Sequence, residues 1–430
     1  MSRGEGHRHS LRTYVFTIAL VSLLYLSTAC LPTRSPEVSQ DSAPSSEAQT
    51  PPIPTKAASI ASPSPVSPPD LSQLRVSTGG WNTDFFRHSV PLDEFRSGGP
   101  PRDGIPPIDH PKLETVVQAD AWLDPREPVL SLTVGGESRA YPLQILTWHE
   151  IVNDQVGGTP VSVTYCPLCN TAIAFDRRVD GRLLDFGTTG NLRHSDLVMW
   201  DRQTESWWQQ ATGEAIVGEL TGQRLEMLAA HLVSWREFRD QFPAARVLSR
   251  ETGFERDYGR NPYVGYDGSD QTPFLLAGTA DSRLAPMERV VAVSLNGEDA
   301  AYPFSALLER RVLHDRLGGQ PIVLFFQPGT LSALDARRIA ESRDIGASGV
   351  YRPEVRGRVL TFAWNVDAFV DAETGSRWNV LGYAIEGPLA AAQLPAVVHV
   401  NPFWFAWAAF KPNLRLWTPD TASHESPPNR

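Results

Sequence analysis

The stretch that decides the fold reads Val129-Leu130-Ser131-Leu132-Thr133-Val134-Gly135-Gly136-Glu137-Ser138-Arg139-Ala140-Tyr141-Pro142, and it recurs later in the chain. The later copy reads Val290-Val291-Ala292-Val293-Ser294-Leu295-Asn296-Gly297-Glu298-Asp299-Ala300-Ala301-Tyr302-Pro303. Each copy predicts a pair of strands joined by a two-residue turn. Gly135-Gly136 and Asn296-Gly297 supply the positive φ angles that a tight hairpin requires.

The match between the two copies continues beyond the hairpins. Without a gap, the first copy has Asp154, Gly157, Gly158 and Pro160 where the second has Asp315, Gly318, Gly319 and Pro321. With small gaps, Asp201, Thr204 and Trp208 match Asp371, Thr374 and Trp378. Pro142 and Pro303 favour helix starts, because proline suits a first helical turn. We predict a strand-dominated α+β fold, made of two copies of one duplicated β-rich unit with short helices.

The N-terminus has the pattern of an export signal. Arg3, Arg8 and Arg12 precede an uncharged stretch at 13–26, and Ser27-Thr28-Ala29-Cys30 follows. The stretch is short for a bilayer span, which favours a signal peptide over residues 1–30. The small residues before Cys30 resemble a bacterial lipobox, so we expect lipidation at Cys30. Ordinary cleavage and an uncleaved anchor are the alternatives. The chain is therefore expected to be an extracytoplasmic lipoprotein that contacts the membrane through its lipid.

Composition divides the rest of the chain. Residues 31–74 are rich in Pro and Ser and predict a disordered tether or a glycosylated stalk. The segments that follow are an N-terminal arm at 75–128, a first repeat unit at 129–250, a connector at 251–289, a second unit at 290–417 and a tail at 418–430. The formal charge is −10 and no basic cluster follows the signal region, so nucleic acid is not an expected partner.

Two cysteines distinguish the first copy from the second. Cys166 and Cys169 lie in the run Thr164-Tyr165-Cys166-Pro167-Leu168-Cys169-Asn170, and they are the only thiols apart from Cys30. The second copy reads Phe325-Phe326-Gln327-Pro328-Gly329-Thr330-Leu331 at the matching place. The fold therefore tolerates this loop without cysteines. The two cysteines either form a disulfide that stabilises the loop locally or take part in chemistry.

The cysteine pair permits a metal site, a redox pair or a disulfide. The loop resembles a metal knuckle, but the chain lacks the second cysteine pair of a four-sulfur site. Completion of the site would need His149, His231 or a carboxylate such as Glu150, in a mixed site for copper or zinc. His149 aligns with Arg310, whereas His231 has a rough counterpart in His399. The alternative is a disulfide between the two cysteines, because exported compartments favour oxidation. This bond would be either a reducible redox pair or a permanent structural link.

A thioredoxin-like arrangement is disfavoured. It needs the first cysteine at a helix N-terminus, where the helix dipole lowers the thiol pKa. Here the loop leaves a strand-like run at 160–165 and enters another at 171–175. Catalytic roles for Cys166 and Cys169 that do not require a helix N-terminus remain alternatives.

Glu205 is the further catalytic candidate. Together with Asp201 it offers paired carboxylates for acid and base chemistry. The second copy has Gly375 in place of Glu205 but keeps Asp371 and Thr374. We therefore expect Asp201 and Thr204 to shape a turn through side-chain hydrogen bonds. Trp207 and Trp208 are expected in the core. The connector run 258–266 is expected to strap the two copies together, with a surface segment that carries binding residues as the alternative.

Four runs together resemble the bacterial DUF3179 family. They are Ser97-Gly98-Gly99-Pro100-Pro101-Arg102-Asp103-Gly104-Ile105-Pro106, Trp148-His149-Glu150-Ile151-Val152-Asn153-Asp154, Tyr165-Cys166-Pro167-Leu168-Cys169, and Asp201-Arg202-Gln203-Thr204-Glu205-Ser206. The resemblance covers most of residues 79–285 and continues more weakly through the second copy. It implies a domain of unknown function and carries no activity with it. The first hypothesis is a thiol-based metal or redox site in the first copy. The alternative is a non-catalytic surface binding protein with a structural disulfide and a ligand cleft between the copies.

Overall fold

The computed structural model describes residues 71–419, and strands dominate this part of the chain. The signal region with Cys30, most of the expected tether and the end of the tail lie outside the described residues. Within residues 71–419, no helix is both long enough and apolar enough to cross a bilayer. The described chain begins inside the expected tether, with a short 3-10 helix at Leu71–Gln73 whose Leu71 packs on the core.

The first hairpin forms as predicted and begins a compact run of elements. Gly135 and Gly136 both have positive φ, 56° and 81°, and join β3 to β4. Pro142 caps the helix that follows. The elements up to the cysteine loop and the strand after it are β3 (Pro128–Val134), β4 (Glu137–Pro142), α2 (Leu143–His149), β5 (Ile151–Val156), β6 (Thr159–Cys166) and β7 (Thr171–Asp176).

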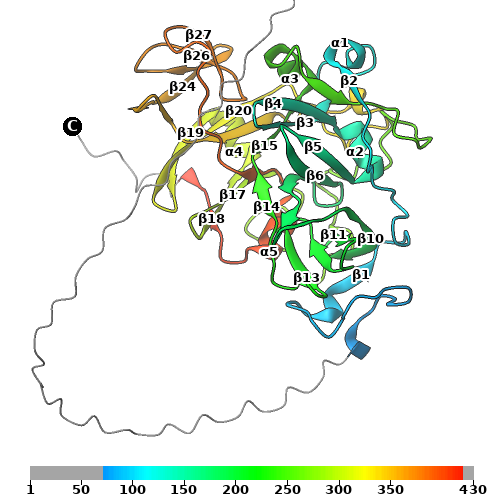
Figure 1. Cartoon of the computed structure of the whole chain (residues 1–430). Helices are drawn as coiled ribbons and strands as arrows, with labels where there is room; N and C mark the ends of the chain where they lie inside the picture. The colour runs from blue at the N-terminus through cyan, green and yellow to red at the C-terminus, as the bar shows by residue number, and fades with distance from the viewer. Residues whose placement is uncertain (1–70, 420–430) are drawn as a thin grey trace, which may run out of the picture. The chain divides into compact units, whose positions relative to one another are not determined.

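Three larger sheets and the two-stranded sheet β8-β9 are built from the first half of the described chain (Figure 1). The orders of the larger sheets are β15-β3-β4-β16-β2, β14-β7-β6-β5 and β1-β10-β11-β12-β13. The remaining elements of this half are η2 (Leu92–Glu94), β1 (Phe95–Ser97), β2 (Leu113–Thr115), α1 (Val116–Ala119), β8 (Arg178–Val179), β9 (Arg182–Leu183), β10 (Phe186–Arg193), β11 (Asp196–Asp201), β12 (Trp207–Gln209), β13 (Glu214–Val217), β14 (Glu226–Leu228), β15 (Ala230–Ser234), α3 (Trp235–Gln241) and β16 (Arg246–Leu248).

The second half repeats the order of hairpin, helix and two long strands. Its elements are β17 (Val290–Leu295), β18 (Glu298–Pro303), α4 (Phe304–Arg310), β19 (Val312–Leu317), β20 (Gln320–Gln327), η3 (Ile339–Glu341), β21 (Ala347–Tyr351), β22 (Glu354–Val355), β23 (Arg358–Val359), β24 (Phe362–Asn365), β25 (Ala368–Asp371), β26 (Arg377–Trp378), β27 (Ala384–Glu386), β28 (His399–Val400), α5 (Trp404–Phe410) and β29 (Arg415–Leu416). Strands β17 and β18 form the second predicted hairpin.

Equivalent side chains in the two halves make the same hydrogen bonds. Tyr141 donates to Asp154 at 2.8 Å, and Tyr302 donates to Asp315 at 2.6 Å. The indole of Trp208 donates to Asp201 at 2.9 Å, a contact that Trp378 and Asp371 repeat at the same distance. Thr204 donates through its backbone N–H to Asp201 at 2.7 Å, which confirms the predicted turn. Trp207 and Trp208 are fully buried, as expected.

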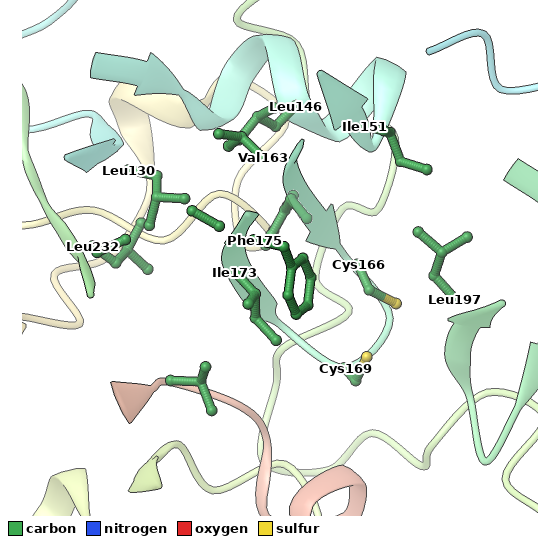
Figure 2. Close-up of a cluster of buried hydrophobic side chains, with 14 of the residues drawn as sticks. Leu130, Leu146, Ile151, Val163, Cys166, Cys169, Ile173, Phe175, Leu197 and Leu232 are labelled. Carbon is green, nitrogen blue, oxygen red and sulfur yellow. The ribbon is translucent and has the colours of Figure 1, made fainter. Parts of the chain in front are cut away.

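The cysteine loop lies inside the core rather than at its edge. Cys166 and Cys169 pack in one apolar cluster with residues of β6 and β7 and with Trp404 of the C-terminal helix α5. Figure 2 shows both sulfur atoms at the loop that joins β6 to β7, with Phe175 beside them and Leu197 of β11 opposite Cys166. The fold therefore encloses the sulfur pair between two sheets.

Candidate metal centre

The loop between β6 and β7 fixes both thiols on one side. Cys166 is the last residue of β6, and Asn170 closes the loop with a φ of 54°, a conformation that asparagine tolerates better than most residues. Cys166 and Cys169 are free thiols and are 1% and 0% exposed. The predicted strands on both sides of the loop are confirmed, so neither cysteine begins a helix.

A carboxylate from the neighbouring sheet completes the cluster. Asp196 is the first residue of β11, and the turn before it has positive φ at His194 and Ser195, 51° and 70°, as tight hairpin turns do. Cys169 Sγ lies 2.8 Å from Asp196 Oδ1. One ligand atom from each of Cys166, Cys169 and Asp196 lies within 4.8 Å of the others. Within residues 71–419 this is the group of three or more metal-binding side chains that the fold assembles.

Hydrogen bonds hold the Asp196 carboxylate in place. Gln209 Nε2 donates to Oδ2 at 2.5 Å, and the backbone N–H of Ala211 donates to the same oxygen at 2.9 Å. The Thr171 hydroxyl lies 3.3 Å from Cys169 Sγ and donates to Gln210 Oε1 at 2.6 Å. Such outer contacts orient metal ligands and tune their affinity.

Burial favours the neutral form of all three side chains, Cys166, Cys169 and Asp196. It raises the pKa of Cys166 and raises that of Cys169 well above its ordinary value. Burial also raises the pKa of Asp196, despite the hydrogen bonds that this carboxylate accepts. Three buried acids of this kind are costly to ionise on their own, whereas a bound divalent cation would stabilise all three anions together. The arrangement is thus chemically suited to a cation and poorly suited to a free thiolate nucleophile.

Glu150 lies beside the cluster with its carboxyl facing a cavity. It follows helix α2 with a φ of 58° and is 6% exposed. Within the described residues its carboxyl makes no hydrogen bond. Burial, followed by the nearby Asp196 carboxyl, raises the pKa of Glu150 to about 8. It lines a cavity of 330 Å³ together with Leu168, from the cysteine loop, and Leu197, which follows Asp196.

The connector and the C-terminal segment close over the cysteine loop. Tyr266 donates its hydroxyl hydrogen to the carbonyl of Leu168 at 2.9 Å. The N–H of Phe403 donates to the carbonyl of Cys169 at 2.9 Å, and Asn170 Nδ2 donates to the carbonyl of Asn401 at 2.7 Å. Parts of the chain far from the loop therefore hold its shape.

The connector also bridges the two halves of the described chain. Trp148 Nε1 donates to the carbonyl of Arg260 at 3.2 Å on one side. On the other, the N–H groups of Asn261 and Gly265 donate to the carbonyls of Arg337 and Asp335. The connector therefore joins the first and second halves of the described chain.

The two predicted histidine ligands lie elsewhere. His149 is fully buried, with Nδ1 2.8 Å from the carbonyl of Pro106 and Nε2 2.6 Å from the hydroxyl of Tyr258. Both ring nitrogens of His149 are thus engaged. His231 faces His399, with ring centroids 5.2 Å apart. Of the four predicted metal ligands, the structure brings together Cys166 and Cys169, and the third position falls to Asp196.

Glu205 lies in a turn that ties the N-terminal arm to the third sheet. It accepts a hydrogen bond from the N–H of Asn82 at 2.7 Å and pairs with Arg102 at 3.2 Å. The Arg102 guanidinium in turn stacks 3.5 Å from the ring centroid of Trp200. Burial acts to raise the pKa of Glu205, but hydrogen bonds from Asn82 and Arg102 outweigh it and leave the pKa below its ordinary value. These contacts describe a structural tie between the arm and the sheet.

The spacing of residues in the sequence indicates neither Asp196 as a partner of the two cysteines nor the cavity that Glu150 lines. Asp196 is 27 residues from Cys169 and belongs to a different sheet. No motif spacing marks it. The turn at His194-Ser195 places Asp196 at the start of a strand, but it contains no glycine or asparagine that would mark it in the sequence.

Comparison with known proteins identifies a family but no individual relative. No curated protein and no solved structure matches the chain. One family model, described as a protein of unknown function, matches residues 102–414, a span that includes Cys166, Cys169 and Asp196. The chain therefore belongs to the DUF3179 family.

Proposed function

We propose that Cys166, Cys169 and Asp196 bind a single metal ion and that the protein functions as an exported metalloprotein. The observation that carries this proposal is the convergence of two thiols and one carboxylate within 4.8 Å in a fully buried position. Buried acids without a counter-charge are costly, so a fold that gathers three of them is explained by a cation that pairs with all three.

Zinc suits this donor set better than copper does. Zinc accepts thiolate sulfur and carboxylate oxygen in one tetrahedral site, whereas copper(I) prefers soft sulfur donors. Three protein ligands leave a fourth position for water or another small ligand, as in zinc sites that act on substrates. A thiol redox role is less well supported, because burial raises the pKa of both cysteines and opposes the thiolate form that exchange needs.

We propose further that the metal site belongs to one of two duplicated units. The order of hairpin, helix and two long strands recurs in the second half, together with the Tyr–Asp and Trp–Asp hydrogen bonds. Gln327 and Thr330 stand in the second half where Cys166 and Cys169 stand in the first. The second unit would then act as a scaffold, since its longer connection between β20 and β21, residues 328–346, carries no cysteine.

The sequence supports placement outside the cytoplasm. Residues 1–30 have the charge pattern of a signal peptide, and Ser27-Thr28-Ala29-Cys30 fits lipid attachment at Cys30. The Pro- and Ser-rich residues 31–74 would hold the folded part away from the membrane surface. Labelling cells with a radioactive or clickable fatty acid, with Cys30→Ser alongside, tests this attachment.

Metal analysis and thiol counting on one preparation test the metal site. The mature protein is purified without chelators and assayed by mass spectrometry for zinc and copper, and its thiols are counted after denaturation. We expect one zinc per chain and two titratable thiols in the parent. Cys166→Ser should lose the metal, while Asp185→Asn, at a half-exposed carboxylate in an ion pair with Arg177, should keep it. A metal-free parent whose two sulfurs are joined in a disulfide would overturn the proposal.

A further inference from the structure

The cavity that Glu150 lines has the size and the varied lining of a binding site. Its volume of 330 Å³ falls in the range of small-molecule pockets. The arm contributes Gly98 and Pro100, β10 contributes Thr188, Gly190, Asn191 and Leu192, and the connector contributes Tyr263, Tyr266 and Phe274. Segments that are distant in sequence thus converge on one small space.

Two polar side chains in the cavity lack protein partners. Glu150 is 6% exposed and Asn191 is 8% exposed, so both are more than nine-tenths buried. Within residues 71–419, neither the Glu150 carboxyl nor the Asn191 side-chain amide makes a hydrogen bond. Their polar atoms are not among the fully enclosed unpartnered ones, so both side chains can contact a molecule that enters the cavity. The cavity therefore presents one carboxyl and one amide to a molecule that enters it.

The charges around the cavity favour a cationic ligand over an anionic one. Glu150 lies near the buried Asp196 carboxyl, and no lysine or arginine occurs among the described residues that line the cavity. An anion would find no compensating cation in this lining, whereas an ammonium group would stabilise the ionised form of the buried Glu150 carboxyl. Apart from Thr188, the rest of the lining is apolar or aromatic, with Leu168, Leu192 and Leu197 beside the two tyrosines. Aromatic faces also attract cations.

We propose that this cavity binds a small organic amine with an apolar or aromatic body, whose ammonium group pairs with Glu150 and hydrogen-bonds to the side-chain oxygen of Asn191. The site goes beyond the metal centre and does not depend on it, because Glu150 and Asn191 are not members of the metal-binding group. The apolar body would lie against the leucines, and the connector tyrosines would cover it.

Calorimetric titration of the full mature protein with three matched probes tests the proposal. The probes are 2-phenylethylamine, 2-phenylethanol and phenylacetate, which share an aromatic body and differ in their polar group. We expect the amine to bind at least tenfold more tightly than the alcohol, with phenylacetate the weakest. Equal binding of the amine and the alcohol, or stronger binding of phenylacetate, would overturn the proposal.

Variants distinguish amine binding at Glu150 from amine binding to the metal and from loss of the fold. Glu150→Gln keeps the shape of the side chain and should abolish the preference for the amine, while Glu226→Gln on exposed β14 should change nothing. Leu192→Phe fills the cavity and should abolish binding of every probe while the metal content is retained. Amine binding should survive in Cys166→Ser. If binding is lost in that variant yet unaffected by Glu150→Gln, the amine is a ligand of the metal and the cavity proposal is wrong.

Discussion

Cys169 Sγ and Asp196 Oδ1 lie 2.8 Å apart although the two residues are 27 positions apart in the chain. Each comes from a tight connection, the β6–β7 loop in one sheet and the β10–β11 turn in another. Packing of the two sheets brings the connections together. The contact converts a cysteine pair into a three-donor group with mixed sulfur and oxygen chemistry.

Asp196→Asn is the most direct test of that third donor. Asparagine keeps the shape and can still accept a hydrogen bond from Ala211, but it binds metal far less well than a carboxylate does. We expect the zinc content to fall below about one-tenth of the parent value, since a metal site depends on ionised ligands. The metal-free form should unfold within about 1 kcal/mol of the metal-free parent, because a buried acid is replaced by a neutral group. Retention of full zinc content would show that Asp196 is not a ligand.

Gln209→Met removes a contact behind Asp196, the proposed metal ligand. Gln209 is 1% exposed, and its amide donates to Asp196 Oδ2 at 2.5 Å. Loss of an outer hydrogen bond typically weakens metal binding by about 10- to 100-fold, so zinc should still bind at one per chain but with lower affinity. Competition with a chromophoric chelator measures the change. Gln203→Met, at an exposed turn position that contacts Asp185, is the matched control and should leave the affinity unchanged.

Asn170 tests whether the backbone of the cysteine loop is held by conformation or by hydrogen bonding. Its φ is 54°, and its side chain donates to the carbonyl of Asn401 at 2.7 Å. Asn170→Gly keeps the conformation and loses the bond, whereas Asn170→Ala loses both. We expect the alanine variant to be less stable than the glycine variant by about 1 kcal/mol in urea unfolding. Equal stabilities would assign the whole effect to the hydrogen bond.

The His231 and His399 pair predicts sensitivity to acid. Burial, followed by the charge of neighbouring His399, lowers the pKa of His231 to about 3. The unfolded chain takes up this proton near pH 6.5, so stability is complete above that pH and is lost as the pH falls toward 3. The loss is at most ~1.4 kcal/mol per pH unit for each such histidine.

Urea unfolding at pH 7, 6 and 5 measures this loss. His231→Phe keeps a ring that can stack on Tyr351 and should reduce the slope of stability against pH. His110→Phe, at an exposed position, should not change it. A slope that is the same in the parent and in His231→Phe would contradict the prediction.

The sequence alone determined the local parts of this protein. Gly135-Gly136 and Asn296-Gly297 specify hairpins, Pro142 and Pro303 start helices, and the cysteine run falls between two strands. The spacing of Asp201, Thr204 and Trp208 likewise predicts a hydrogen-bonded turn. These features depend on backbone dihedral preferences and on contacts within a few residues, so short stretches of sequence encode them.

Only the tertiary structure decided which side chains meet. His149 and Glu150 are adjacent, yet the left-handed turn at Glu150 separates their side chains. The imidazole bonds to Pro106 and Tyr258, and the carboxyl faces the cavity. Asp196 reaches the thiols because two sheets pack together, and the connector closes the cavity from far along the chain. Such contacts follow from burial of apolar faces, which many residues share and no short motif records.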